Sequence, residues 1–405
     1  MADSGNPSNE ELKSVRDAFL KELDSGMKFW TKHSHDEQYG GFLMCLAEDG
    51  EVYDTHKYGW MQCRQVWMYT YLYQHFEKFR TPEILDAAKK GLQFIREHLP
   101  MRHLEGRAQK RCYFAVTREG KPYRVQRKPF TECFFAMALW GMYEITGEEA
   151  LKDQAMAELE AYAYWAREDA SDLGAPVLEG QPSVSMLNRP MMLLNLILLM
   201  VKPDSDFFAR HATWCIERIL KHSQGGYILE ILGLDDKPLE GSEGRHLNPG
   251  HAMEASWFLM EYWRKFDSGN SKLLQTAIDE FLTRPLEYGW DEKFGGVFMF
   301  LDRDGYPPVH LEWDMKLWWP HCEGMIACLM AYQHTGDAKH WKAFRQLYDY
   351  SFKHYPDAKH GEWFGYVNRQ GEISQTLKAG PYKGCFHTVR CWALCSELVD
   401  SILKK

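Results

Sequence analysis

The residues best suited to chemistry stand near the starts of predicted apolar helices. In NPGHAMEASW (248–257) a Pro-Gly pair precedes His251 and Glu254, whose three-residue spacing puts both side chains on one helix face. His387 and Arg390 in GCFHTVRC have the same spacing. Histidine titrates near neutral pH and serves as a general acid or base, while an arginine stabilises developing negative charge. The pattern therefore indicates proton-transfer chemistry.

Further polar residues begin other apolar segments at nearly equal intervals, with one wide gap between Glu132 and His251. Arg64, His321 and Glu323 belong to this set. A single residue of this kind is more often a helix cap or a satisfied core group than a ligand. Because three histidines recur at comparable repeat positions, we expect the set to converge on one funnel.

Repetition along the chain indicates how these residues are positioned. A pattern of aspartate, paired small residues, an alternating segment and a polar-Gly turn predicts β-hairpins, each followed by a helix apolar on nearly all sides. The clear hairpins span 36–54, 291–309 and 357–375, and weaker copies span 111–125 and 225–240. SVSMLNRPMMLLNLILLM (183–200) fills the wide gap as a sixth inner helix.

Six amphipathic helices of surface type alternate with these six inner helices. Such short units bury their inner helices only by closing into a ring. We therefore predict an all-α fold, an (α/α)6 barrel with short β-hairpins at the mouth end. It forms a single domain over residues 1–405, of which 1–11 are expected to be flexible.

Composition limits the classes of partner and compartment. The 405 residues are 45% hydrophobic and 26% charged, which predicts a globular protein with a sizeable core. A net charge of −9 argues against nucleic acid and anionic membranes as partners. The first residues do not resemble a signal peptide, and the apolar run MMLLNLILLMV is too short to span a bilayer. We expect a cytoplasmic protein whose ten cysteines are free thiols.

Several reaction classes lack their sequence signals. The chain has neither HExxH nor CxxC for zinc, no P-loop and no nucleophile elbow, so we predict no catalytic metal. Two classes remain open. One is glycoside hydrolysis by a carboxylate pair, and the other is proton abstraction next to a carbonyl by histidine. The 15 Trp and 21 Tyr suit a sugar substrate in either case. The carboxylates available for a pair are Glu132, Glu254, Glu323 and Glu362.

Five long motifs resemble those of the N-acylglucosamine 2-epimerase family, also known as renin-binding proteins, and most closely its vertebrate members. They are YGWMQCRQVWMY, RHLNPGHAMEASW, EWDMKLWWPHCEGMIACLM, GEWFGYVNRQG and KGCFHTVRC. The resemblance implies an (α/α)6 barrel that reversibly interconverts N-acetyl-D-glucosamine and N-acetyl-D-mannosamine. It also implies a homodimer, an association with renin, and ATP or another nucleotide as an allosteric effector, with no cofactor consumed. An aldose-ketose isomerase and an (α/α)6 glycoside hydrolase are the alternatives.

The resemblance also implies roles for individual residues. His251 and His387 match the acid/base pair of the family, which removes the C2 proton of the open-chain sugar from one face and returns it to the other. Glu254 is then expected to accept a hydrogen bond from His251, and Arg390 or Arg64 to stabilise the enolate oxygen. The expected substrate-binding residues are Arg64, Glu254, His321, Glu323 and Arg390, of which His321 is included by spacing alone. Asn188 and Arg189 receive no role.

Overall fold

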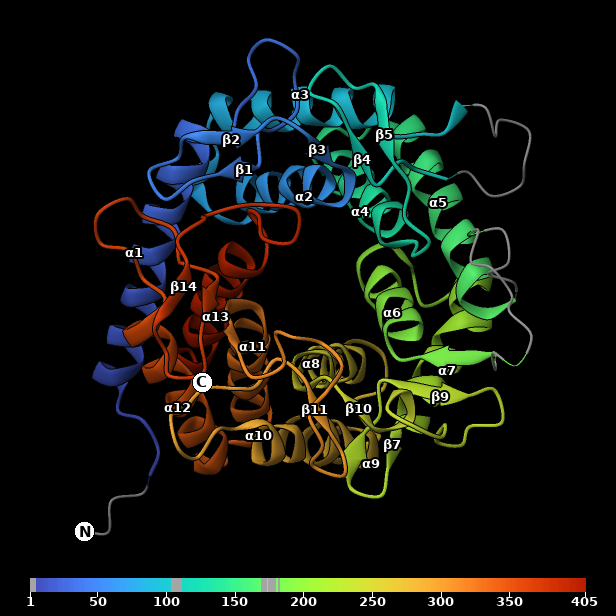
Figure 1. Cartoon of the computed structure of the whole chain (residues 1–405), viewed down its shortest axis with the longest axis vertical. Coiled ribbons are helices and arrows are strands. Elements are labelled where there is room, and N and C mark those ends of the chain that lie inside the picture. Colours follow the sequence, from blue (N-terminus) through green and yellow to red (C-terminus); the bar gives the residue numbers. More distant parts are fainter. Residues whose placement is uncertain (1–4, 103–110, 169–172, 174–179, 181–182) are drawn as a thin grey trace.

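The structure is a computed structural model that describes residues 5–102, 111–168, 173, 180 and 183–405. Within these residues, six inner helices surround the barrel axis and outer helices form a second ring around them (Figure 1). This arrangement confirms the predicted (α/α)6 barrel. The inner helices are α2 (Gly59–His75), α4 (Phe130–Thr146), α6 (Asn188–Met200), α8 (Pro249–Phe266), α11 (Trp318–Thr335) and α13 (His387–Leu403).

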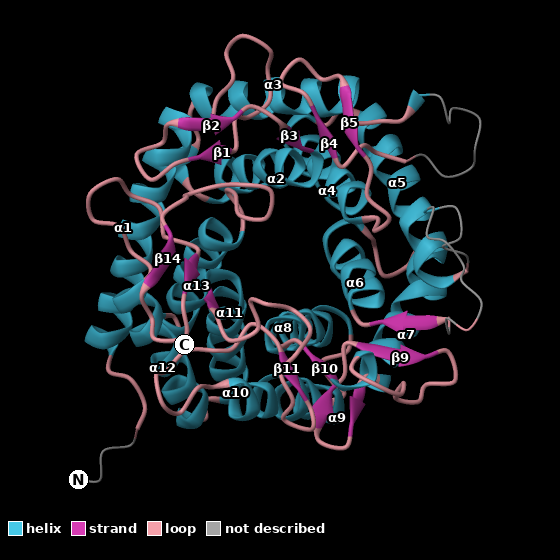
Figure 2. Ribbon diagram, in the orientation of Figure 1, coloured by secondary structure: helices cyan, strands magenta, loops and turns pink. Residues whose placement is uncertain are grey.

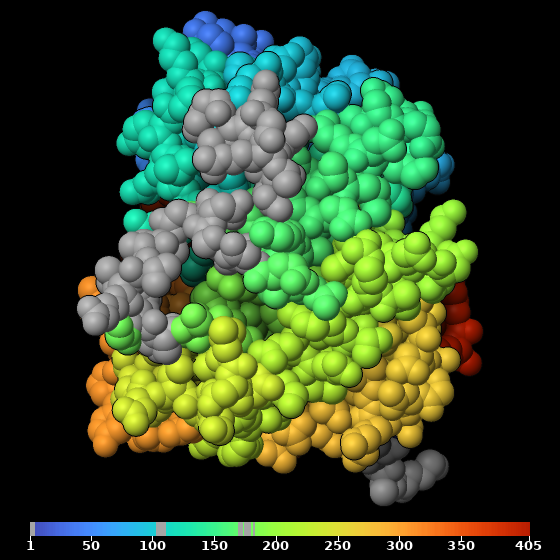
Figure 3. All heavy atoms as spheres, turned by 90° about the vertical axis from the view of Figure 1, so that its right-hand side faces the viewer, coloured from blue at the N-terminus to red at the C-terminus, as the bar shows by residue number. Residues whose placement is uncertain are grey.

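The outer helices bury one face and expose the other, as their periodicity predicts. In α3, Ile84, Leu92 and Ile95 are buried while the lysines on the opposite face are exposed. Figure 3 shows the outer wall from the side. The outer helices are α1 (Asn9–His33), α3 (Pro82–His98), α5 (Glu149–Arg167), α7 (Asp206–Lys221), α9 (Ser271–Ile278) continued by α10 (Arg284–Gly289), and α12 (Ala338–His354). A π-helical turn over Asp279–Thr283 separates α9 from α10, next to Pro285.

Short strands at one end of the barrel join neighbouring repeats (Figure 2). The strand just before an inner helix pairs with the hairpin of the following repeat, as β3 (Lys57–Tyr58) does with β4 (Ala115–Val116). The other pairs of this kind are β6 (Val184–Met186) with β9 (Ile231–Gly233), β10 (His246–Leu247) with β11 (Leu301–Asp302), and β12 (Lys316–Leu317) with β13 (Tyr366–Val367).

The first and last repeats are joined in the same way. The N–H of Leu46, in β1 (Cys45–Leu46), donates to the carbonyl of Ala379 at 3.3 Å, and the N–H of Lys378 donates to the carbonyl of Leu46 at 3.0 Å. Helix α1 packs against α13 below this junction. The starts of all six inner helices are therefore held at one end of a closed barrel.

The aspartate that begins each of the three clear hairpin repeats forms a buried ion pair with a lysine. Asp36 contacts the amine of Lys57 at 2.9 Å, and Asp291 contacts that of Lys316 at 3.1 Å. In the last repeat the aspartate Asp357 pairs with a third buried lysine at 2.7 Å. Each lysine precedes the next inner helix. The ion pair therefore joins the start of a hairpin to the segment that leads into that helix.

Three predicted hairpins form locally: β1 with β2 (Val52–Asp54), β4 with β5 (Pro122–Arg124), and β13 with β14 (Ile373–Gln375). In 225–240 the hairpin is smaller, β7 (Ser223–Gln224) with β8 (Tyr227–Ile228). In 291–309 the strand β11 pairs with the preceding repeat instead. Of the stretch 1–11, residues 1–4 lie outside the described residues, and α1 already begins at Asn9. No described helix is long and apolar enough to cross a bilayer.

Candidate active site

His251 lies in the first turn of α8, at the strand end of the barrel. The side chain of Asn248 caps the helix by accepting the His251 backbone N–H at 3.2 Å, and Pro249 occupies the first helical turn. The Nδ1 atom of His251 lies 2.9 Å from Oε1 of Glu230, a carboxylate that is 7% exposed. The imidazole is 23% exposed. A carboxylate on Nδ1 fixes the ring orientation and leaves Nε2 for proton transfer.

His387 begins α13 and is held in the same way. Its Nδ1 lies 2.7 Å from Oε1 of Glu323 on α11, and this carboxylate is fully buried. Helix α11 packs against both α8 and α13, so the two histidines come from helices on either side of it. Two histidines of one barrel end thus share one arrangement, with Nδ1 on a buried carboxylate.

Trp319 lies between the two histidines. Its ring centroid is 5.3 Å from that of His251 and 5.8 Å from that of His387. The indole is partly exposed, and it belongs to the first turn of α11. An aromatic face between two imidazoles suits the C–H face of a sugar ring.

Arg390 connects the carboxylates beneath this pair. Its Nη2 donates to Oε1 of Glu254 at 2.8 Å and to Oε1 of Glu323 at 2.7 Å. Ligand atoms of Glu254, Glu323 and His387 lie within 4.8 Å of one another, a grouping that can hold a cation. The guanidinium already supplies positive charge to both carboxylates at this position.

Arg64 on α2 has no polar partner among the described residues. Its Nε is buried without a hydrogen bond, and the side chain is 8% exposed. The guanidinium instead lies over the rings of Trp60, Phe134 and Phe386, with centroid distances of 4.1 to 4.8 Å. A buried arginine without a protein acceptor is suited to bind an oxygen atom of a ligand.

The two histidines have opposite pKa shifts. Burial lowers the pKa of His251, but the charge and hydrogen bond of Glu230 outweigh burial and leave the pKa raised. The pKa of His387 is well below its usual value, because burial and the nearby charges of Arg64 and Arg390 disfavour the imidazolium. The opposite shifts therefore favour His251 as the acid and His387 as the base.

Two residues that were expected to face the funnel, His321 and Glu132, bind hairpins instead. His321 is fully buried, where its Nε2 accepts the N–H of Val297 at 2.9 Å and its Nδ1 lies 2.7 Å from the carbonyl of Leu317. Burial lowers its pKa to about 3, so it is a neutral structural group. His321 and Glu323 are two residues apart, and that spacing points them to different sides of the helix.

Glu132 occupies a position near the start of α4 that is comparable to that of His321 in α11. Like His321, it accepts the backbone N–H of a hairpin residue. Its Oε1 accepts the N–H of Cys112 at 2.9 Å and pairs with Arg111 at 2.8 Å. In α2 the equivalent residue is Gln62, whose Oε1 accepts the N–H of Phe42 at 2.8 Å. The regular spacing of polar residues therefore arises in part because some of these side chains attach the hairpins to the inner helices.

Glu230 is the site residue that the sequence did not reveal. The carboxylate expected beside His251 was Glu254, but that residue pairs with Arg390. The available signal was a charged residue inside the apolar stretch GGYILEILG, where a strand of the weakest hairpin was predicted. Arg64, Glu254, Glu323 and Arg390 do lie with the histidines at this end of the barrel.

The carboxylates do not form a hydrolytic pair. Glu132 is bound to a hairpin, and Glu362 accepts the indole N–H of Trp30 at 2.7 Å and the amine of Lys383 at 2.9 Å. Glu254 and Glu323 bind one nitrogen of Arg390. Neither is placed to deliver a proton to a leaving group, as glycoside hydrolysis requires.

The chain is similar to known proteins along nearly its whole length. A family model described as N-acylglucosamine 2-epimerase (GlcNAc 2-epimerase) matches residues 40–391. The N-acylglucosamine 2-epimerase of Bos taurus is 45% identical over 401 residues, which cover 98% of this chain and 94% of the relative. That of Homo sapiens is 42% identical, with coverage of 98% and 92%. The solved cellobiose 2-epimerase of Spirochaeta thermophila has 19% identity, a TM-score of 0.80 and coverage of 97% and 98%, a likeness of fold.

Proposed function

The chain belongs to the N-acylglucosamine 2-epimerase family, and from this premise we propose how its barrel inverts C2 of an N-acetylhexosamine. The relatives at 42% and 45% identity carry an epimerase name, which favours epimerisation over the isomerase and hydrolase alternatives. The substrates are N-acetyl-D-glucosamine and N-acetyl-D-mannosamine in their open-chain forms, because only the free aldehyde makes the C2 hydrogen acidic.

Two acid/base groups perform the inversion. His387, whose pKa is lowered, removes the C2 proton, and His251, whose pKa is raised, delivers a proton to the other face of the planar intermediate. A single group would return the proton to the face from which it came. The reverse reaction starts from the opposite protonation state of the pair. Each positioned group contributes about 10²- to 10⁴-fold to the rate.

Negative charge develops on the aldehyde oxygen as the C2 proton leaves. We assign this oxygen to Arg64, whose guanidinium has no hydrogen-bond acceptor among the residues that the structure describes, so its N–H groups are available to the intermediate. Arg390 holds Glu254 and Glu323, and thereby fixes the carboxylate on His387. The observation that supports the proposal is that each histidine has its own carboxylate on Nδ1, while burial and the charges of Arg64 and Arg390 lower the pKa of His387 and Glu230 raises that of His251.

Hydrogen exchange in D₂O tests the proposal. N-acetylglucosamine incubated with the protein and followed by NMR is expected to acquire deuterium at C2 as the manno epimer appears. His251→Ala and His387→Ala should each abolish epimerisation without unfolding the barrel. Label at C1 would establish aldose-ketose isomerisation instead. An unchanged turnover number in either variant would refute the acid/base assignment.

Family membership also supports proposals on assembly and regulation. We propose a cytoplasmic homodimer that responds to ATP or another nucleotide without consuming it, and that associates with renin. Sedimentation with and without ATP tests the dimer, and the rate of epimerisation at fixed substrate tests the effector. A pull-down with renin, compared between the protein and His251→Ala, tests whether that association depends on the active site.

A further inference from the structure

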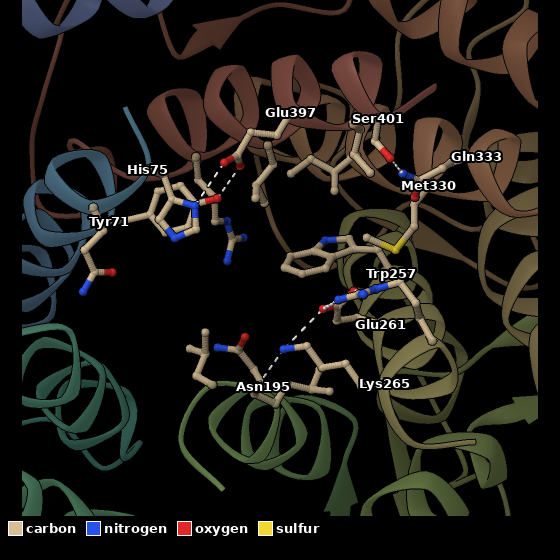
Figure 4. A pocket seen from close by; sticks show the side chains of 18 of the residues that line it. Tyr71, His75, Asn195, Trp257, Glu261, Lys265, Met330, Gln333, Glu397 and Ser401 are labelled. Carbon is tan, nitrogen blue, oxygen red and sulfur yellow. Dashed lines mark hydrogen bonds and ion pairs between the residues drawn. The ribbon is translucent and has the colours of Figure 1, made fainter. Parts of the chain in front are cut away.

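A cavity of about 750 Å³ lies at the other end of the barrel from the strands, and all six inner helices contribute to its wall (Figure 4). The side chains labelled in Figure 4 belong to α2, α6, α8, α11 and α13 and surround a common space. None of the proposed acid/base histidines lines it. The proposed epimerisation leaves this space without a function.

Trp257 and Arg390 separate the cavity from the active site. Both line the cavity, and both also contact the catalytic cluster, because the Trp257 indole N–H donates to Oε2 of Glu323 at 2.9 Å. Among the described residues, the Arg390 guanidinium donates its side-chain hydrogen bonds through Nη2 alone, to Glu254 and Glu323. A ligand oxygen in the cavity could accept a hydrogen bond from the remaining terminal nitrogen, Nη1.

Asn195 is the second polar group at the cavity wall without a strong partner. It stands within the apolar run of α6 and is 5% exposed. Its amide nitrogen has only a sulfur contact, at 3.6 Å to Met137. An asparagine in an apolar helix is costly to bury unless its amide binds something, so its presence here points to a polar ligand.

Several charges at the outer part of the cavity are paired with one another. Glu397 accepts hydrogen bonds from Tyr71 and contacts His75 at 3.1 Å. Glu261 binds Arg264 at 2.6 Å, and Lys265 lies 3.3 Å from the same carboxylate. These internal pairs leave little net charge to select an ion. Their remaining lone pairs and N–H groups suit a molecule with many hydroxyls.

We propose that this far-end cavity is a second carbohydrate site, which binds a neutral monosaccharide against Trp257 with hydroxyls on Asn195 and Arg390. The faces of Trp67, Tyr71 and Trp257 supply the apolar surface that sugar C–H groups need. Hydroxyls both donate and accept, so one ligand satisfies an arginine at depth and carboxylates at the rim. The site carries out no proton transfer and is separate from the proposed epimerisation.

Methionine methyl NMR tests the second site, because Met330 lines the cavity. We would label the methionine methyl groups with ¹³C in a His387→Asn background, which keeps the added sugar unreacted, and assign the signal with Met330→Leu. Titration with N-acetylglucosamine should shift the Met330 methyl signal saturably. Methyl β-glucoside, which cannot open its ring, should do the same.

Variants of α6 and α13 provide the controls. Leu198→Trp, which fills the cavity, should abolish the Met330 shift, and Asn195→Leu should weaken binding about 10-fold through one lost hydrogen bond. Ile402→Trp, a half-buried position that does not line the cavity, should retain the shift. A Met330 signal that stays fixed, or that shifts equally in Leu198→Trp, would overturn the proposal. Epimerisation by the chain with His387 intact is measured separately, so failure of either proposal is recognised on its own.

Discussion

Glu230 accepts the Nδ1–H of His251 across 2.9 Å, although the two residues belong to different elements of the same repeat. Glu230 follows β8 and lies 6% exposed, while His251 opens α8. The contact gives the first histidine a dedicated counter-ion, as Glu323 gives the second. The carboxylate nearest in helix spacing, Glu254, is used by Arg390 instead.

Replacement of Glu230 by glutamine should change the pH dependence of epimerisation. Because Glu230 raises the pKa of His251, the imidazolium persists to higher pH with the carboxylate than without it. In Glu230→Gln the alkaline limb of kcat/KM should move to lower pH, and kcat should fall at least ~10-fold, though less than on loss of the acid itself. The pH profile decides the matter, since an alkaline limb that does not move would contradict the role of Glu230.

Arg64→Met should separate activity from stability. The lost guanidinium binds the enolate oxygen, so kcat/KM should fall about 10²- to 10³-fold. The melting temperature should stay unchanged or rise, because the variant removes a buried charge that has no protein acceptor. Arg64→Lys should not restore activity, since an ammonium group lacks the planar surface that packs on three aromatic rings. Steady-state kinetics and calorimetry measure the two effects.

His321→Gln should leave epimerisation within about twofold of normal, because Gln62 already makes the equivalent bond in α2. His321→Ala leaves the buried Val297 N–H without an acceptor and should cost about 1 to 3 kcal/mol in the free energy of unfolding. Urea unfolding and KM for both variants test this structural role. A KM that rises sharply in His321→Gln, with stability unchanged, would show that His321 binds the substrate.

Removal of one partner of the buried Asp291–Lys316 ion pair should destabilise the protein more than replacement of both partners. Asp291→Ala leaves a buried ammonium beside a ring, and should cost about 3 to 5 kcal/mol. Asp291→Leu combined with Lys316→Met should recover most of that loss. The pKa of Asp291 is held at about 2, so its contribution is present above the unfolded pKa near 4 and is lost as pH falls toward 2. Chemical unfolding at pH 7 and at pH 3 measures both effects.

The repeats made the barrel predictable, because each apolar helix and each turn leaves a local pattern. The side chains that face the barrel interior are harder to predict, since a shift of one residue turns a side chain by about 100° around a helix. That rotation distinguishes His321, which binds a hairpin, from Glu323, which holds His387. Glu230 is not found from the sequence because it lies 21 residues before His251 in another element, and spacing within one helix carries no information on such contacts.

The contact between the first and last repeats has a consequence for the order of the chain. Leu46 bonds to Ala379 as other neighbouring repeats bond to each other, and Arg16 on α1 binds Asp400 on α13 at 3.1 Å. The first and last helices are therefore joined as neighbouring repeats are. A circular permutant, opened at Gly336 between α11 and α12 and joined at the natural ends, keeps every described pairing between repeats.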